Sequence, residues 1–183
     1  MASEIAVPAD HEGLVWFYAR GMVEQLGLAP PLGRAIQQAV RLHDIGLNFV
    51  PPHVLSKPDR LTPREFLLVQ RHATISETLS RKMIHHADEV AAIVRSHHER
   101  LDGTGYPDGR WGREIPLGAR IIAVADGFDA LTSTRPYRSA RSWMEALDEM
   151  EEEAGAQHDP MLVAALSTWL EQFADSLLAR EGL

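Results

Sequence analysis

The chain has 183 residues, a formal net charge of −8 at neutral pH, nine histidines and no cysteine. This length fits one domain, and a hydrophobic fraction of 45% is enough for one sizeable core. The lack of cysteine excludes disulfides and cysteine nucleophiles, and the negative charge argues against a broad surface for nucleic acid or for an anionic membrane. No apolar run approaches the roughly 20 residues of a membrane span, and no signal peptide is visible. We therefore expect a cytoplasmic protein.

Glycine and proline divide the chain into predicted helices, and strand-like alternation is nearly absent. Prolines and a glycine at 30–33 separate the first two helices. In chain order the helices are expected at about 12–26, from about 30–33 to about 44, and at 62–83, 87–98, 116–132, 142–155 and 160–179. Thr62 and Ser142 each begin a capping box. An irregular loop is expected at 51–58, and a glycine-rich loop with room for a brief hairpin at 101–115. The pattern predicts an all-α domain of about seven helices over residues 1–183.

Several histidines stand where a helix should present a core residue, and two aspartates lie near them. The set comprises His11, His43, Asp44, His72, His97, His98 and Asp126. Burying that many imidazoles without partners would be unfavourable, and a shared metal centre would satisfy them together. Neutral imidazole and carboxylate suit iron, manganese, zinc and related divalent ions. The alternative is that each ring is a core histidine that bonds a backbone carbonyl.

Asp44 is open to two interpretations. A carboxylate can bridge two metals that lie roughly 3.5–4 Å apart. On a regular helix His43 and Asp44 project about 100° apart, so both reach one centre only if the helix ends there, and Gly46 makes such an end reasonable. Asp44 could instead cap local backbone amides.

Two further segments could contact a ligand. In the loop after His98, glycines allow a close backbone approach, and Tyr106, held by Pro107, could stack on a base or bond a phosphate. Arg135 and Arg138 flank a Pro-Tyr pair and could make charge-assisted contacts to phosphate. Taken alone, each segment could instead be an ordinary surface turn.

Taken in order, these motifs resemble the HD-GYP family of metal-dependent phosphohydrolases. The resemblance lies in His43–Gly46, His97–Glu99, Asp102–Pro107, Ala125–Thr132 and Arg135–Arg138, and it covers about residues 11–169. It implies an HD-type helical bundle with a C-terminal helix at about 160–179. It also implies hydrolysis of cyclic di-GMP, a bacterial second messenger, to linear pGpG, which can be followed by GMP.

The resemblance also implies roles for single residues. The metal ligands would be His43, Asp44, His72, His97, His98 and Asp126, and His11 matches a histidine on the first helix of the family. Two divalent ions are expected, with iron or manganese favoured and zinc or nickel as alternatives. A hydroxide bridging them beside His43 and Asp44 would attack the phosphodiester. Gly105, Tyr106, Pro107, Arg135 and Arg138 would contact the substrate, and Lys57 is a further candidate.

Two departures from the family pattern bear on activity. Members commonly carry Lys after His-Asp-Ile-Gly, where this chain has Leu47, so a cyclic di-GMP receptor that does not hydrolyse its ligand is an alternative. Some members hold a third metal with a Glu one turn before the first His, where this chain has Val7, and we therefore expect two metals. A further alternative is a phosphohydrolase that acts on another nucleotide.

The expected partners follow from the same resemblance. They are cyclic di-GMP and, through the Gly-Tyr-Pro loop, cyclases of the GGDEF type. The charge of −8 argues against DNA or RNA polymers as partners, and no membrane segment is visible. Exposed helical faces would permit a homodimer.

Overall fold

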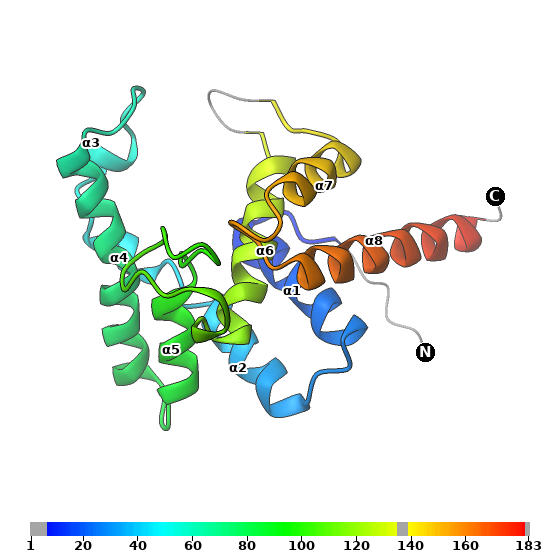
Figure 1. The fold of residues 1–183 in the computed structure, drawn as a ribbon, viewed down its shortest axis with the longest axis horizontal. Coiled ribbons are helices and arrows are strands. Elements are labelled where there is room, and N and C mark those ends of the chain that lie inside the picture. Colours follow the sequence, from blue (N-terminus) through cyan, green and yellow to red (C-terminus); the bar gives the residue numbers. More distant parts are fainter. Residues whose placement is uncertain (1–6, 135–138, 182–183) are drawn as a thin grey trace.

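A computed structural model describes residues 7–134 and 139–181. Within these ranges the chain forms eight α-helices and two short 3-10 helices, and β structure is limited to two isolated bridges (Figure 1). The predicted all-α fold is confirmed. No helix in the described part of the chain combines the length and apolar character that a bilayer span requires.

The described helices follow the predicted order. They are α1 (His11–Gln25), α2 (Pro30–Val40), α3 (Pro52–Leu55), α4 (Pro63–Met83), α5 (Asp88–Ser96), α6 (Leu117–Thr132), α7 (Trp143–Glu152) and α8 (Pro160–Glu181), with 3-10 helices η1 (Ile45–Phe49) and η2 (Gly112–Glu114). The short helix α3 was missed, because its four residues were read as part of an irregular proline loop. The predicted hairpin in the glycine-rich loop is reduced to one bridge, between Asp102 and Trp111.

The second predicted helix ends earlier than expected. α2 stops at Val40, and His43 and Asp44 lie in a turn that leads into η1. The backbone there tightens to bonds between residues three apart, such as the one from the Leu47 amide to the Asp44 carbonyl (2.9 Å). The Asp44 side chain makes no cap hydrogen bond to η1, so the capping interpretation of this carboxylate is wrong.

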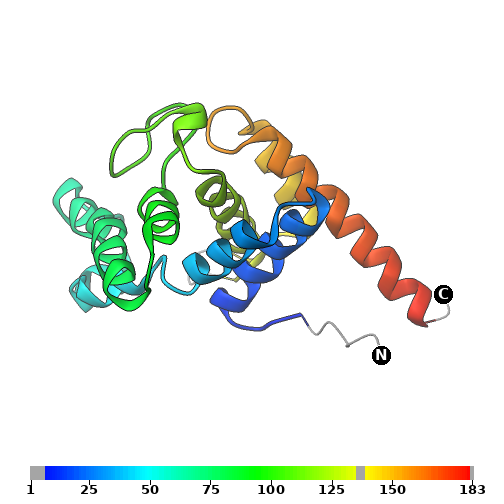
Figure 2. The same cartoon turned by 90° about the horizontal axis from the view of Figure 1, so that it is seen from below.

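One hydrophobic cluster joins six of the helices: α1, α2, α5, α6, α7 and α8. α6 buries residues on several sides, including Ile121, Ile122 and Phe128, and Tyr18 of α1 packs edge-on against Phe128 with ring centroids 4.8 Å apart. α8 lies against α1 and α7, and its C-terminal turns extend past them (Figure 2). The core therefore fixes α1 and α6 relative to each other.

α4 packs outside this cluster, on α5 and η1. Its buried residues are small or polar: His72, Ala73, Ser76 and Ser80. The capping box that the sequence predicts at its start is present, with Thr62 and Glu65 bonded reciprocally. The fully buried part of this contact therefore consists of small and polar side chains, with half-buried apolar residues beside them.

Gly21 allows α1 and α8 to approach each other, and Gly21→Ala tests this packing. A Cβ at position 21 would lie 2.2 Å from Cδ2 of Trp169. We expect a net loss of about 1–3 kcal/mol in the free energy of unfolding through overpacking, although alanine has the higher helix propensity. Urea denaturation followed by circular dichroism measures it. The loss should shrink in a Trp169→Leu background, and an unchanged or raised stability of the single variant would contradict this account.

Candidate functional site

All seven predicted ligand residues come together at one place. They belong to α1, the turn before η1, α4, the C-terminal end of α5, and α6. They form two groups, and within each group the donor atoms lie within 4.8 Å of one another. The first group is Asp44, His72, His97 and His98, and the second is His11, His43 and Asp126. Residues separated by more than 100 positions in the sequence thus share one cluster.

Three of the histidine rings are oriented in the same way. The Nδ1 atoms of His43, His72 and His97 lie 2.6–2.7 Å from the carbonyl oxygens of Val40, Val69 and Val94, each three residues earlier. A nitrogen that donates to a carbonyl carries its proton there, so the opposite nitrogen, Nε2, presents a lone pair. The two interpretations of these histidines are therefore compatible, because each ring bonds a carbonyl with one nitrogen and faces the cluster with the other.

The Nε2 atoms lack complementary partners within the described residues. His72 Nε2 lies 3.2 Å from His97 Nε2, and His43 Nε2 is buried with no hydrogen-bond partner in that part of the chain. Burial, with the neighbouring imidazole of His97, lowers the pKa of His43 and His72. Converging buried lone pairs require an electrophilic partner, and a divalent cation fits them.

Asp44 belongs to the first group and also faces the second. Its Oδ1 is 3.3 Å from His72 Nε2 and 3.7 Å from His97 Nε2. Its Oδ2 is 3.7 Å from His43 Nε2 and 4.0 Å from His11 Nε2. Burial acts to raise the pKa of Asp44, but the nearby imidazoles of His97, His43 and His72 outweigh it and hold the pKa below its ordinary value. One anionic carboxylate therefore faces two donor groups, as a ligand shared by two cations must.

Gly46 brings the turn that carries Asp44 against α4. The Gly46 amide donates to Ser76 Oγ at 2.8 Å. A Cβ at position 46 would lie 2.3 Å from the carbonyl oxygen of His72, so any side chain would push η1 away from α4. The sequence predicted Gly46 as a helix stop, and the structure shows that the close approach is what needs glycine.

His11 is oriented by a side chain that the sequence analysis missed. Its Nδ1 lies 2.7 Å from Oδ2 of the buried Asp129, whose Oδ1 accepts from Ser133 Oγ. The bond to Asp129, with the nearby charge of Asp126, raises the pKa of His11 against the effect of burial. The available signal was the spacing on α6, because Asp129 follows Asp126 by about one turn on the same helix.

The glycine-rich loop folds back over the cluster. The buried carboxylate of Glu99 accepts from the amides of Asp108 and Arg110, at 2.7 and 3.0 Å. A Cβ at Gly105 would lie 2.4 Å from the Arg100 nitrogen, so only glycine permits this fold of the loop. These contacts place the ring of Tyr106 close to that of His98, with centroids 4.8 Å apart.

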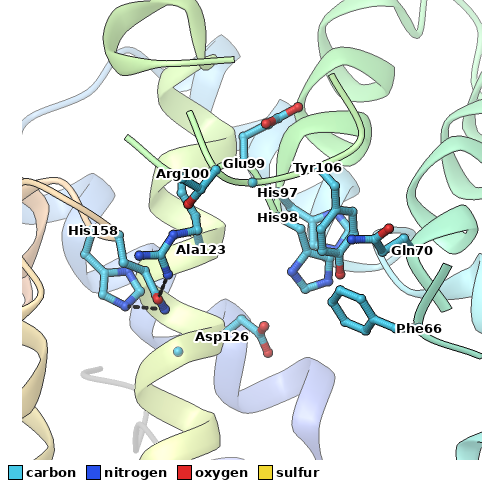
Figure 3. A pocket seen from close by; sticks show the side chains of 14 residues that line it. Phe66, Gln70, His97, His98, Glu99, Arg100, Tyr106, Ala123, Asp126 and His158 are labelled. Carbon is cyan, nitrogen blue, oxygen red and sulfur yellow. Dashed lines mark hydrogen bonds between the residues drawn. The ribbon is translucent and has the colours of Figure 1, made fainter. Parts of the chain in front are cut away.

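A cavity of about 290 Å³ adjoins the cluster (Figure 3). Its lining includes His97, His98 and Asp126 from the cluster, Gly105 and Tyr106 from the loop, and Phe66 and Gln70 from α4. Ligand-binding cavities in proteins are concave in this way and carry a few convergent polar groups. The cavity is therefore the candidate binding site.

Two other predicted residues, Lys57 and Pro107, do not line the cavity. Lys57 bonds Glu65, with Nζ 2.7 Å from Oε2, and Pro107 follows Tyr106 without lining the cavity. Arg135 and Arg138 lie outside the described residues. Leu47, at the position where the family commonly carries Lys, lines a separate hollow beside α3. Gly105 and Tyr106 are thus the described substrate candidates that line the cavity.

Comparison with known proteins decides the family. The model of the HD domain family matches residues 5–162. The chain belongs to the HD domain family. A solved structure described as Bd1817, a HDG"Y"P protein from Bdellovibrio bacteriovorus, has the same fold as this HD domain, with a TM-score of 0.71 at 20% identity over 88% of this chain and 51% of that one.

Two curated relatives are closer in sequence to this HD domain. The cyclic di-GMP phosphodiesterase response regulator RpfG of Xanthomonas campestris pv. campestris (strain 8004) is 46% identical over 151 residues, which cover 81% of this chain and 40% of RpfG. The 3′3′-cGAMP-specific phosphodiesterase 3 of Vibrio cholerae is 40% identical over 167 residues, which cover 91% of this chain and 36% of that protein. The HD domain spans less than half the length of either relative.

His158, to which the sequence analysis assigned no role, is buried at the edge of the cavity. Its side chain lines the cavity beside Gln157 (Figure 3). Burial, together with the charge of Arg100, lowers the pKa of His158 from 6.5 to about 4. The folded domain therefore holds this imidazole in its neutral form.

This burial predicts a component of acid sensitivity. The unfolded chain protonates His158 near pH 6.5 and the folded chain only near pH 4, so the unfolded state binds more protons between these values and stability falls as the pH falls through them. The difference amounts to about 3 kcal/mol. We expect His158→Leu to lose less stability than the wild type between pH 7 and pH 4, by up to that amount, in urea denaturation with a chelator present. His53→Leu, at an exposed histidine, is the control, and equal losses in all three proteins would refute this role.

Proposed function

We propose that this HD domain is a metal-dependent phosphodiesterase that hydrolyses cyclic di-GMP to linear pGpG, with GMP as the product of a second cleavage. The observation that carries the proposal is the position of Asp44, whose two oxygens face two separate groups of nitrogen and oxygen donors. The cavity beside these groups provides room for a substrate. The name of the Xanthomonas relative, at 46% identity, supports the choice of cyclic di-GMP.

Two divalent ions would occupy the donor groups, with Asp44 shared between them. Imidazole and carboxylate donors suit iron, manganese, zinc and nickel, and the resemblance to the HD-GYP family favours iron or manganese. When bound, such ions lower the pKa of water and stabilise negative charge on phosphoryl oxygens. Val7 is exposed and stands where some members of the family hold a third metal with Glu. A valine side chain has no donor atom, which supports two ions rather than three.

The chain itself supplies orientation. The bonds from Nδ1 to backbone carbonyls hold the rings of His43, His72 and His97 in one tautomer, and Asp129 holds His11. Burial raises the pKa of Tyr106, so its hydroxyl keeps its proton and can donate a hydrogen bond to a phosphate oxygen. These groups are fixed before a substrate binds, which reduces the reorganisation required during the reaction.

A cyclic di-GMP receptor is the second candidate, and Leu47 is the observation that favours it. An aliphatic side chain stands where members of the family commonly carry Lys, and it lies in a hollow apart from the cavity. The domain therefore has no ammonium group at this position of η1. A third candidate substrate, 3′3′-cGAMP, is supported by the name of the Vibrio relative.

The other expectations extend the same proposal. We propose a single domain over residues 1–183, in a protein of the bacterial cytoplasm where the proposed messenger acts. Cyclases of the GGDEF type would contact the loop at 101–115, and exposed helical faces would permit a homodimer.

A turnover assay tests the proposed activity. The protein is loaded in turn with iron, manganese, nickel and zinc, incubated with cyclic di-GMP, and the products are separated by chromatography. We expect pGpG with at least one metal. Absence of product with all four metals would contradict the enzymatic proposal, and tight binding in the same samples would then favour the receptor.

A further inference from the structure

Phe66 and Gln70 lie on one face of α4, and both side chains face the cavity. Phe66 is 46% exposed although it carries a large aromatic ring. Gln70 follows one turn later, and its amide makes no hydrogen bond to another side chain or backbone group in the described parts of the chain. Both residues line the cavity beside the histidine cluster (Figure 3). Aromatic rings stack on nucleobases, and amides pair with their edges.

Tyr106 completes this part of the wall from the glycine-rich loop. Its ring lies 6.1 Å from that of Phe66, at an interplanar angle of 82°. Figure 3 shows Phe66, Gln70 and Tyr106 on one side of the cavity, with Asp126 on the other. Phe66 and Tyr106 form an aromatic corner, and the amide of Gln70 lies beside it. Asp126 of the cluster lies opposite (Figure 3).

The start of α4 is fixed, so Phe66 has a defined position. Thr62 and Glu65 form the capping box, and Lys57 holds Glu65 from the preceding loop at 2.7 Å. The hydrogen bond from Lys57, with those from Thr62, lowers the pKa of Glu65 to about 2, so this carboxylate stays ionised at neutral pH. Lys57 thus acts through Glu65 on the helix that carries Phe66.

The same helix links this corner to the cluster. Gln70 precedes His72 by two residues on α4, and the ring of Tyr106 lies 6.3 Å from that of His72. The ring of Tyr106 therefore lies near both Phe66 and His72, and so between Phe66 and the cluster in ring-to-ring distance.

We propose that Phe66, Gln70 and Tyr106 form a nucleobase subsite, and that Gln70 allows this subsite to accept either purine. The inference rests on the proposed function, since the cluster must hold the phosphodiester. An amide offers one donor and one acceptor side by side. Guanine presents O6 next to N1–H, and adenine presents an amino group next to a ring nitrogen acceptor, so a rotated amide pairs with both. Because 3′3′-cGAMP carries a guanine as well as an adenine, it can place its guanine at this subsite, so cyclic di-GMP and cyclic di-AMP compare the two purines, and both are then substrates of this domain.

A carboxylate at position 70 would remove this tolerance. It only accepts hydrogen bonds, so it matches the two adjacent donors of guanine, N1–H and the amino group. Against adenine, one carboxylate oxygen would face a ring nitrogen lone pair. Gln70→Glu keeps the shape of the side chain and should therefore separate the two purines.

The experiment measures kcat/KM for cyclic di-GMP and cyclic di-AMP in matched variants. In Gln70→Glu the ratio of cyclic di-GMP to cyclic di-AMP should rise by about fivefold or more. Arg71→Gln makes the same change in net charge at the neighbouring exposed position and should keep the ratio of the wild type. In Phe66→Leu, KM should rise by about tenfold for both substrates through lost stacking, while Leu67→Ala, at an exposed position outside the cavity, should change little.

The outcomes separate this inference from the proposed function. Turnover of only one dinucleotide by the wild type, or an unchanged ratio in Gln70→Glu, would overturn the subsite and leave the phosphodiesterase standing. If neither dinucleotide is hydrolysed with any metal, the proposed function fails, and titration calorimetry with the same proteins then decides. Binding that weakens in Phe66→Leu and turns toward cyclic di-GMP in Gln70→Glu would support the subsite, and binding equal to that of the wild type would overturn it.

Discussion

The contact of one carboxylate with converging imidazole lone pairs is the constraint on which the site depends. Asp44 reaches the Nε2 atoms of His72 and His97 with one oxygen and those of His43 and His11 with the other. Buried lone pairs that face each other at 3.2 Å repel unless a cation lies among them. The fold opposes this repulsion by anchoring the opposite nitrogens on backbone carbonyls and on Asp129. The cluster therefore requires a cation, which the atoms of the protein do not supply.

The net charge of the chain does not describe the charge at the cluster. A value of −8 excludes a broad basic surface, yet the proposed substrate is anionic. Two divalent ions would add roughly four positive charges at the cluster, which the sum over the whole chain conceals. The aromatic corner at Phe66 and Tyr106 adds recognition that does not depend on charge, because stacking acts on the face of a base. Phosphate and base would thus be recognised by different physical means.

The sequence predicts the helices and the ligand cluster well, because both follow from periodicity. A histidine in an apolar stripe is visible at helical spacing, and all seven ligand candidates meet in the structure. A helix end near His43 and Asp44 was expected, but its position at Val40 could not be predicted, since the turn depends on Gly46 lying against the His72 carbonyl. Asp129 was missed because its partner, His11, lies 118 residues away. Phe66 was missed because an exposed aromatic residue looks like surface until the loop with Tyr106 faces it.

The number of divalent ions bound per chain tests the central claim most directly. Elemental analysis after loading with manganese or iron and removal of free metal would count them. The shared carboxylate predicts two ions in the wild type and the loss of both in Asp44→Ala, while Asp59→Ala, at an exposed aspartate, keeps two. Two ions retained in Asp44→Ala would contradict the bridging role of this residue.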